Sequence, residues 1–144
     1  MLIEKNFKNL KLPKLGNFLK IINSKKIDKI VICQGADVLN EALKIKDEII
    51  AMKNTSLFSA VWLNNLNEKE ILNFNKKKIL VFQSSTEFGS YGSFLSKKIL
   101  SSMYNLKKFK IISINNLPEC GQNDEILNYH QLSSSKILKQ IKGF

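Results

Sequence analysis

In the loop FGSYGS, residues 88–93, glycines and serines form a pattern that could bind a ligand or take part in catalysis. It follows an apolar run and precedes a helical pattern, a position where glycine-rich loops of α/β proteins can cradle a phosphate. Its glycines permit a positive φ and a close backbone approach, and Ser90 can cap the helix. Backbone N–H groups at that helix start would then favour an anion. The candidate residues of an anion-binding or interface loop are therefore Glu87, Gly89, Ser90, Gly92 and Ser93, with Lys97 or Lys98 in support.

A second interpretation explains the same loop without a ligand. The stretch has no GxGxxG pattern and no GK[ST] ending, which a phosphate loop would require. Gly89 and Gly92 can instead shape a turn and let a helix pack closely on a strand. We favour this turn-and-packing interpretation, and anion binding stays as the alternative.

No other reactive group has a complete set of partners in the sequence. Glu87 could act as a general base only if it is buried. His130, the single histidine, has no neighbouring nucleophile or carboxylate motif, so we expect a surface or turn residue. Cys33 lies in an apolar run and Cys120 in a polar loop, and with one histidine they do not complete a zinc site. Trp62 is expected to end a strand and join the core. The sequence thus predicts no catalytic, metal-ligating or cofactor-binding residues.

The net charge of +11 raises a third possibility, a Lys-rich nucleic-acid-binding protein. All 23 basic residues are lysine, and none is the arginine whose planar fork reads guanine edges and clamps phosphates. The lysines are also spread along the chain. Solvated lysines at helix ends and turns explain this pattern better, so nucleic acid is not an expected partner.

Alternating apolar runs and helical patterns predict the elements that would position these residues. Expected strands cover residues 17–23, 29–33, 57–63, 78–82 and 109–114. Expected helices cover 38–52, capped by Asp37; 68–75, with a capping box of Asn67 and Glu70; 91–104, with Leu95, Ile99 and Met103 on its buried face; and two short helices starting near Asn123 and Ser133. Continuous apolar strands that alternate with helices indicate a three-layer α/β/α fold with a mostly parallel five-stranded sheet.

The first strand differs from the others in its connection. Only about six residues separate it from the second strand, whereas a parallel crossover needs about a dozen or more. It should therefore be antiparallel, at an edge of the sheet. We expect residues 1–16 to form an N-terminal arm and residues 17–144 to form one α/β domain. No apolar run approaches the ~20 residues that span a bilayer, and no signal-peptide pattern begins the chain, so a cytoplasmic protein is expected.

Four stretches in order resemble the C-terminal domain of transketolase-like, thiamine diphosphate-dependent enzymes. That group includes transketolase, 1-deoxy-xylulose-5-phosphate synthase and the beta subunit of 2-oxoacid dehydrogenases. The stretches are KIVICQGADVLNEALK (29–44), AVWLNNLNEKEI (60–71), ILVFQSSTEFGSYGSFLSKKI (79–99) and INNLPECGQNDEILNYHQLSSSKILKQI (114–141). The family's Pro-Leu-Asp turn stands here as Asn65-Leu66-Asn67, and its paired acidic residues stand as Gln83-Ser84, which leaves the subfamily open.

In this family the cofactor and the chemistry belong to the two preceding domains. The Gly-Asp-Gly motif for magnesium and diphosphate is absent from this sequence. The resemblance therefore implies a non-catalytic domain, or a separately encoded subunit, that supports oligomer assembly and associates with thiamine diphosphate-binding domains. Thiamine diphosphate and magnesium are implied for the full enzyme and not for this chain alone. An independent module that binds a small anion or metabolite remains the alternative.

Overall fold

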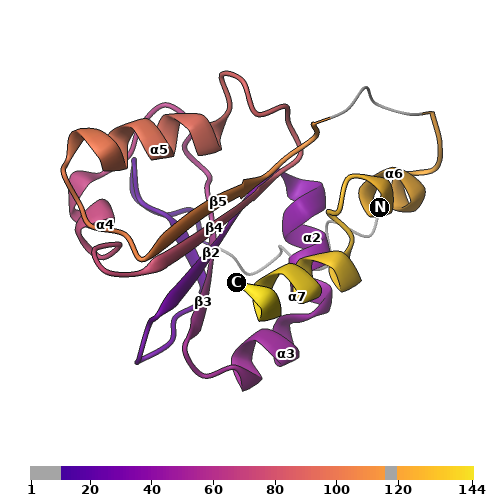
Figure 1. The fold of residues 1–144 in the computed structure, drawn as a ribbon, viewed down its shortest axis with the longest axis horizontal. Helices are drawn as coiled ribbons and strands as arrows, with labels where there is room; N and C mark the ends of the chain where they lie inside the picture. The colour runs from indigo at the N-terminus through magenta and orange to yellow at the C-terminus, as the bar shows by residue number, and fades with distance from the viewer. Residues whose placement is uncertain (1–10, 116–119) are drawn as a thin grey trace.

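The computed structural model describes residues 11–115 and 120–144 and shows a five-stranded sheet with helices on both faces (Figure 1). The strand order is β1-β3-β2-β4-β5. β1 pairs antiparallel with β3 at one edge, and the other pairings are parallel. The fold class that the sequence predicted, including the antiparallel first strand at an edge, is confirmed. The strands are β1 (Leu19–Ile22), β2 (Lys29–Gln34), β3 (Thr55–Ser59), β4 (Lys78–Gln83) and β5 (Lys108–Ile112).

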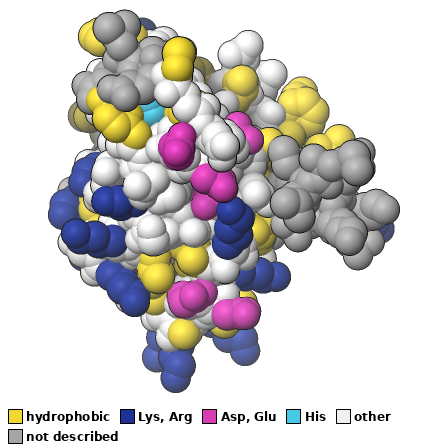
Figure 2. Space-filling model, turned by 90° about the vertical axis from the view of Figure 1, so that its right-hand side faces the viewer, with side chains coloured by type: hydrophobic (Ala, Val, Ile, Leu, Met, Phe, Trp, Pro, Cys, Tyr) yellow, Lys and Arg dark blue, Asp and Glu magenta, His cyan; other side chains and the backbone are white. Residues whose placement is uncertain are grey.

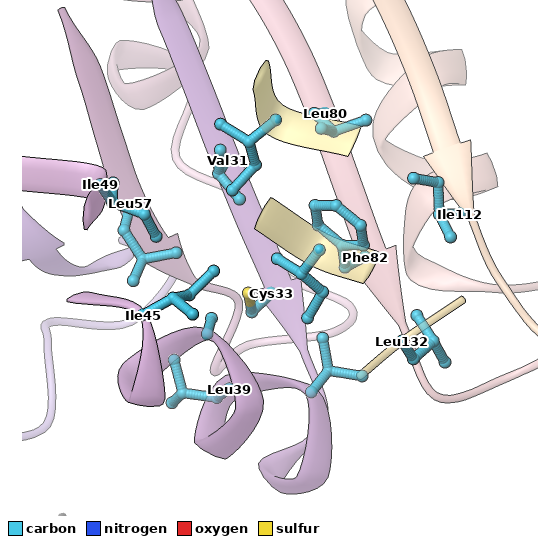
Figure 3. Close-up of a cluster of buried hydrophobic side chains, with 14 of the residues drawn as sticks. Val31, Cys33, Leu39, Ile45, Ile49, Leu57, Leu80, Phe82, Ile112 and Leu132 are labelled. Carbon is cyan, nitrogen blue, oxygen red and sulfur yellow. The ribbon is translucent and has the colours of Figure 1, made fainter. Parts of the chain in front are cut away.

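Two separate apolar clusters lie on the two faces of the sheet, because successive side chains of a strand point to opposite sides. Val31 and Cys33 of β2 point to one face, where they meet the cluster drawn in Figure 3. Ile30 and Ile32 point to the other. The first face is covered by α2 (Ala36–Lys44), α3 (Lys46–Ala51), α6 (Asn123–Tyr129) and α7 (Ser134–Gly143), and the second by α4 (Glu68–Leu72) and α5 (Tyr91–Ser101).

Several predicted boundaries were wrong. The helix expected over 38–52 is two helices, because the backbone at Ile45 leaves helical geometry with φ −111°. The first begins at Ala36 after Gly35, so Asp37 lies in the first turn and is not the cap. The strands expected at 57–63 and 109–114 run over 55–59 and 108–112. Helix α5 ends at Ser101, and Met103 lies beyond it with φ +55° and is 92% exposed, not on a buried face.

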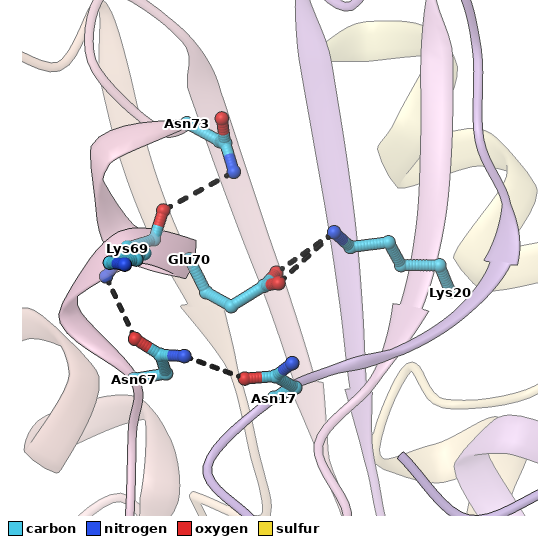
Figure 4. A network of polar contacts seen from close by, with 6 residues as sticks. All are labelled: Asn17, Lys20, Asn67, Lys69, Glu70 and Asn73. Carbon is cyan, nitrogen blue, oxygen red and sulfur yellow. Dashed lines mark hydrogen bonds and ion pairs between the residues drawn. The ribbon is translucent and has the colours of Figure 1, made fainter. Parts of the chain in front are cut away.

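The start of α4 is only partly as expected (Figure 4). Asn67 is the cap, and its Oδ1 accepts a hydrogen bond from the Lys69 N–H at 3.0 Å. The expected capping box is wrong, because the Glu70 carboxylate instead forms an ion pair with Lys20 of β1 at 3.1 Å. Asn67 Nδ2 also donates to Asn17 Oδ1 at 2.9 Å. These contacts fix the edge strand β1 against α4.

Helix α7 is capped at its amino end by a residue of another helix. The buried Glu41 of α2 accepts a hydrogen bond from the Ser134 N–H at 2.8 Å and also pairs with Lys44. A carboxylate at a helix amino end satisfies an otherwise unpaired donor and complements the helix dipole. Glu41 therefore joins α2 to α7, which lie side by side in Figure 1.

We predict that Glu41→Ala lowers the free energy of unfolding by about 1.5–3 kcal/mol, the range for a hydrogen bond to a charged group. The exposed Glu48 of α3 provides a matched control, and its replacement by alanine should change stability by less than ~0.5 kcal/mol. Urea denaturation of the two variants measures both values. Equal losses in the two variants would contradict a specific role for Glu41.

Lysines at the amino ends of the strands meet the carboxyl end of α7. Lys29 and Lys78 are register partners on β2 and β4. The Lys29 ammonium donates to the Ile141 carbonyl, and the Lys78 ammonium donates to the Phe144 carbonyl at 2.8 Å. Cations at this position satisfy unpaired carbonyls and oppose the negative end of the helix dipole. Burial first, and then the charge of Lys78, lowers the pKa of Lys29 below its usual 10.5.

This lowered pKa gives stability a pH dependence with a defined sign. Between the folded-state pKa of Lys29 and 10.5, the unfolded chain binds more protons, so stability rises with pH in that interval. We predict that the stability of the wild type relative to Lys29→Met increases as the pH rises toward 10.5. Denaturation curves of both proteins at several alkaline pH values measure the difference. A difference that stays constant with pH would contradict the burial of a charged amine.

Candidate functional site

Gln83, the last residue of β4, organises the glycine-rich loop. Its side chain is fully buried. Gln83 Nε2 donates to the Thr86 carbonyl at 3.2 Å, and Gln83 Oε1 accepts from the Gly92 N–H at 2.9 Å. One amide side chain thus joins the strand, the loop and the first turn of α5. Gln83 was not predicted as a site residue, because its position at the end of a strand gives no local sign of the contact with Gly92.

The serines of the loop complete this local structure. Ser90 caps α5, as expected: its Oγ accepts from the Ser93 N–H at 3.4 Å. The hydroxyls of Ser90 and Ser93 both donate to the Glu87 carbonyl. The hydroxyl groups therefore hold the loop against the helix start and are engaged within the protein.

The two glycines have different physical roles. Gly89 has φ +67°, the left-handed region that glycine adopts without a Cβ penalty. Gly92 lies within α5, where an added Cβ would come within 3.0 Å of Ile111 Cδ1 and 2.9 Å of Gln83 Oε1. Gly89 turns the chain and Gly92 lets α5 approach β5, so both glycines have the turn and packing roles that we favoured.

The geometry offers little to an anion at the start of α5. Gln83 and Ser90 already accept hydrogen bonds from two of the N–H groups in the first turn. Lys97 lies six residues after Tyr91, about 9 Å along the helix axis at ~1.5 Å per residue. Lys98 is one residue farther and its ammonium lies 6.0 Å from the Phe94 ring centre. Two N–H groups of the first turn are therefore already used within the protein, and both lysines lie at least one helical turn beyond them.

A hollow of about 360 Å³ opens beside the loop, at the carboxyl ends of β2 and β4. Ligands of open α/β sheets commonly bind at this end. Its wall includes Gln34, whose buried Oε1 has no hydrogen-bond partner among the described residues. Phe88 and Leu63 form its exposed rim, with 97% and 49% of their surfaces accessible. Side chains with a formal charge are absent from the described lining, which suits an apolar group with a hydrogen-bond donor.

The β2 loop is fixed against the β4 loop next to Gln34, which lines this hollow. Gly35 has φ +101°, and an added Cβ would lie 2.2 Å from Ser84 Oγ. The Ser84 N–H donates to the Gln34 carbonyl at 3.3 Å. The backbone angle therefore requires glycine at position 35, and an added Cβ would also displace the Ser84 hydroxyl.

The other residues considered in the sequence do not join this site as reactive groups. Glu87 is exposed, so the burial that a general base would need is missing. Burial raises the pKa of the Cys33 thiol to about 12, which keeps it protonated and unreactive. Cys120 is exposed, as its polar loop indicated. Trp62 lies beyond the end of β3 and is half-buried, so it does not end a strand as expected.

His130 lies in the turn after α6, as expected of a turn residue, but it is buried and not on the surface. Its ring packs edge-to-face with Tyr129 at 5.0 Å. The described residues hold no group of three or more His, Cys, Asp and Glu side chains that could bind a metal ion. Residues 116–119, which belong to the stretch 114–141 compared above, lie outside the described chain, as do residues 1–10 of the expected N-terminal arm.

Lysines are numerous on the surface of the described chain. On the face shown in Figure 2, acidic and hydrophobic side chains lie between them. Several lysines also make intramolecular contacts, including Lys107 with Asp28 and Lys110 with Gln140. The Lys107 hydrogen bond lowers the pKa of Asp28. Within the described chain, moreover, no helix is both long and apolar enough to cross a membrane.

Comparison with solved structures identifies the fold. A split-gene transketolase, described as an inactive beta4 tetramer, superposes with a TM-score of 0.68 at 13% identity, over 89% of this chain and 42% of that one. A Campylobacter jejuni transketolase gives 0.61 at 14% identity, over 94% and 20%. A Pichia stipitis transketolase variant gives 0.58 at 13% identity, over 89% and 18%. This chain thus spans less than half of each of these chains.

The similarity lies in the fold and not in the sequence. No protein-family model matches the chain, and no curated protein matches it. The five-stranded mixed sheet with helices on both faces is the fold of the corresponding part of the transketolase chains. The fold that the resemblance implied is therefore confirmed.

Proposed function

We propose that this protein is a non-catalytic association domain, or a separately encoded subunit, of a transketolase-like thiamine diphosphate-dependent enzyme, acting in the cytoplasm. The observation that carries the proposal is the shared fold, which covers 89% of this chain and less than half of a split-gene transketolase chain. A domain that forms part of a larger enzyme needs a surface that contacts the other domains or subunits of that enzyme. The internally hydrogen-bonded loop 84–92, with the exposed Phe88, is our candidate for that surface.

The chemistry of the described residues supports association rather than cofactor binding by this chain. Magnesium prefers octahedral oxygen ligands, usually carboxylates together with diphosphate oxygens. The hollow at the carboxyl end of the sheet is lined by amides, hydroxyls and aromatic rings, and no metal-ligand group is present in the described chain. These residues do not fit a magnesium–diphosphate site. In our proposal the partner chains hold thiamine diphosphate and magnesium.

Phe88 is the residue of this surface with the clearest expected role. A wholly exposed aromatic ring in water gains most from burial against a partner. The loop that carries it is held by Gln83, Ser90 and Ser93, so little conformational entropy is lost on association. Such a pre-positioned aromatic next to a hollow is typical of interface residues with large energetic effects.

We predict that Phe88→Ala raises the Kd for a thiamine diphosphate-binding partner chain by roughly 30-fold or more, the consequence of losing about 2 kcal/mol. Stability should change by less than ~0.5 kcal/mol, because the side chain is 97% exposed. Isothermal titration calorimetry measures the affinity. Leu100→Ala, at a 77% exposed position on α5, should leave the Kd unchanged. Equal effects of the two variants would contradict an interface at this loop.

The proposal itself is tested by co-expression with the thiamine diphosphate-binding chain of the same genome. The expected result is one complex in size-exclusion chromatography that contains both chains. Separate elution of the two chains at micromolar concentration would contradict it. A thermal shift with phosphate or with nucleotides, in the absence of a partner chain, would instead support the alternative of an independent ligand-binding module.

A further inference from the structure

A second hollow, also of about 360 Å³, opens on the α4 side of the sheet. It lies between the connection that follows β1 and the connection that leads from α4 to β4. Its base is formed by Ile27, Ile30 and Phe58, which belong to the apolar cluster on that face. It shares no lining residue with the hollow beside the glycine-rich loop. This second hollow is therefore an independent feature of the molecule.

Three lysines converge on the rim of the second hollow: Lys20, Lys25 and Lys77. Lys20 forms an ion pair with the carboxylate of Glu70 (Figure 4). The charge of Lys77 contributes to the lowered pKa of Asp28, but the carboxylate of Asp28 accepts its hydrogen bond from Lys107. Within residues 11–115 and 120–144, neither Lys25 nor Lys77 has an ion-pair or side-chain hydrogen-bond partner. Among the described residues, Lys25 and Lys77 thus place two positive charges at the rim outside any ion pair, and an anion there would be attracted to both.

The remaining walls define what kind of anion fits. Two carboxamides, Asn23 and Asn73, stand beside the lysines. Asn73 Nδ2 donates to the Lys69 carbonyl at 3.3 Å (Figure 4), which fixes the orientation of its side chain. The Phe58 ring at the base lies 5.8 Å from the Lys20 ammonium. The hollow therefore combines a cationic rim with an apolar base, and its volume suits a small organic molecule.

We propose that the second hollow binds a small organic phosphate monoester. Its phosphate lies between Lys25 and Lys77, and its organic part lies over the base formed by Ile27 and Phe58. Phosphate carries close to two negative charges at neutral pH and matches two unpaired ammonium groups as point charges. This inference does not depend on the association proposed above, because the two features lie at different ends of the sheet.

The test uses the full chain and three probes: phenyl phosphate, inorganic phosphate and phenol. Titration followed by ¹H–¹⁵N correlation spectra should shift the amide signals around Asn23, Lys25 and Asn73, and leave those of loop 84–92 unchanged. Phenyl phosphate should bind at least fivefold more tightly than inorganic phosphate or phenol, because it alone uses both rim and base. Equal binding of phenyl phosphate and inorganic phosphate, or shifts spread over many lysines, would overturn the proposal.

A matched pair of double variants separates the hollow from general positive charge. Lys25→Gln with Lys77→Gln removes the two unpaired rim charges, and we expect the Kd for phenyl phosphate to rise at least tenfold. Lys26→Gln with Lys76→Gln removes the same charge one residue away, at exposed positions that do not line the hollow, and should change the Kd less than twofold. Equal weakening in both variants would show non-specific attraction and overturn the site. Thermal denaturation confirms that both variants are folded.

Discussion

Replacing Phe18 with alanine should lower the free energy of unfolding by about 3–5 kcal/mol, the range for removing a large buried aromatic side chain. Phe18 directly precedes β1 and is 4% exposed. Its ring centre lies 5.8 Å from that of Phe58, 5.5 Å from that of Phe74 and 6.4 Å from that of Tyr91. One side chain therefore joins the edge of the sheet to the helices on the α4 side, and its loss leaves a cavity among three aromatic rings.

Urea denaturation measures this effect, and Leu15→Ala is the control. Leu15 precedes the same strand but is 64% exposed, so its truncation should change stability by less than ~0.5 kcal/mol. If Phe18→Ala were as mild as Leu15→Ala, the segment before β1 would not be an integral part of the folded domain. A folded domain that begins close to residue 17 requires the large difference.

The second large effect is expected for Gln83→Leu, which should destabilise the protein by about 2–4 kcal/mol. Leucine has a similar size but cannot accept from the Gly92 N–H or donate to the Thr86 carbonyl. The Gly92 N–H would be buried without a partner, which costs ~1–3 kcal/mol, and the loop hydrogen bond to Thr86 adds about 1 kcal/mol. The loop that carries Phe88 should lose its fixed position at the same time.

Two measurements separate this prediction from a general loss of packing. Amide hydrogen exchange of Gly92 should be slow in the wild type and much faster in Gln83→Leu. The same substitution at Gln140, whose Oε1 accepts from Lys110 at an exposed site, should change stability by less than ~0.5 kcal/mol. A slow Gly92 amide in the Gln83→Leu variant would contradict the hydrogen-bonding role of Gln83.

The sheet could be predicted because its central strands are buried on both faces. A strand such as β4, with residues 79–83 all buried, must be apolar almost throughout, and that pattern is visible in the sequence. The antiparallel direction of β1 followed from the short connection to β2, since chain length limits which crossovers can form. Both features are determined by one short segment of sequence, without contacts from distant residues.

The failures occurred where a distant contact decides the outcome. Glu70 has the spacing of a capping-box residue, but Lys20 of the neighbouring strand forms an ion pair with its carboxylate. His130 stands in a polar stretch and is nevertheless buried, because α6 and α7 pack on the same face of the sheet. In the sequence Gln83 resembles an ordinary strand end, and only the folded chain brings the Gly92 N–H to its side-chain oxygen. No local pattern reports such partners.

The candidate loop was recognised from its glycines, but its chemistry was not. Gly89 and Gly92 indicated a turn and a close approach, and both features are present. The exposure of Phe88 and the unpaired Gln34 acceptor depend on how the β2 and β4 loops meet, which the sequence does not specify. The resemblance of four ordered stretches correctly predicted the transketolase-type fold at 13% identity, because it rested on element order and not on conserved chemistry.

The most direct test of the association role is sedimentation velocity of this chain with the thiamine diphosphate-binding chain encoded nearest to it in its own genome. We expect a single complex of fixed stoichiometry, whose thiamine-dependent activity differs from that of the partner alone and which the Phe88→Ala substitution dissociates. Independent sedimentation of the two wild-type chains at tens of micromolar, with the partner's activity unchanged, would contradict it.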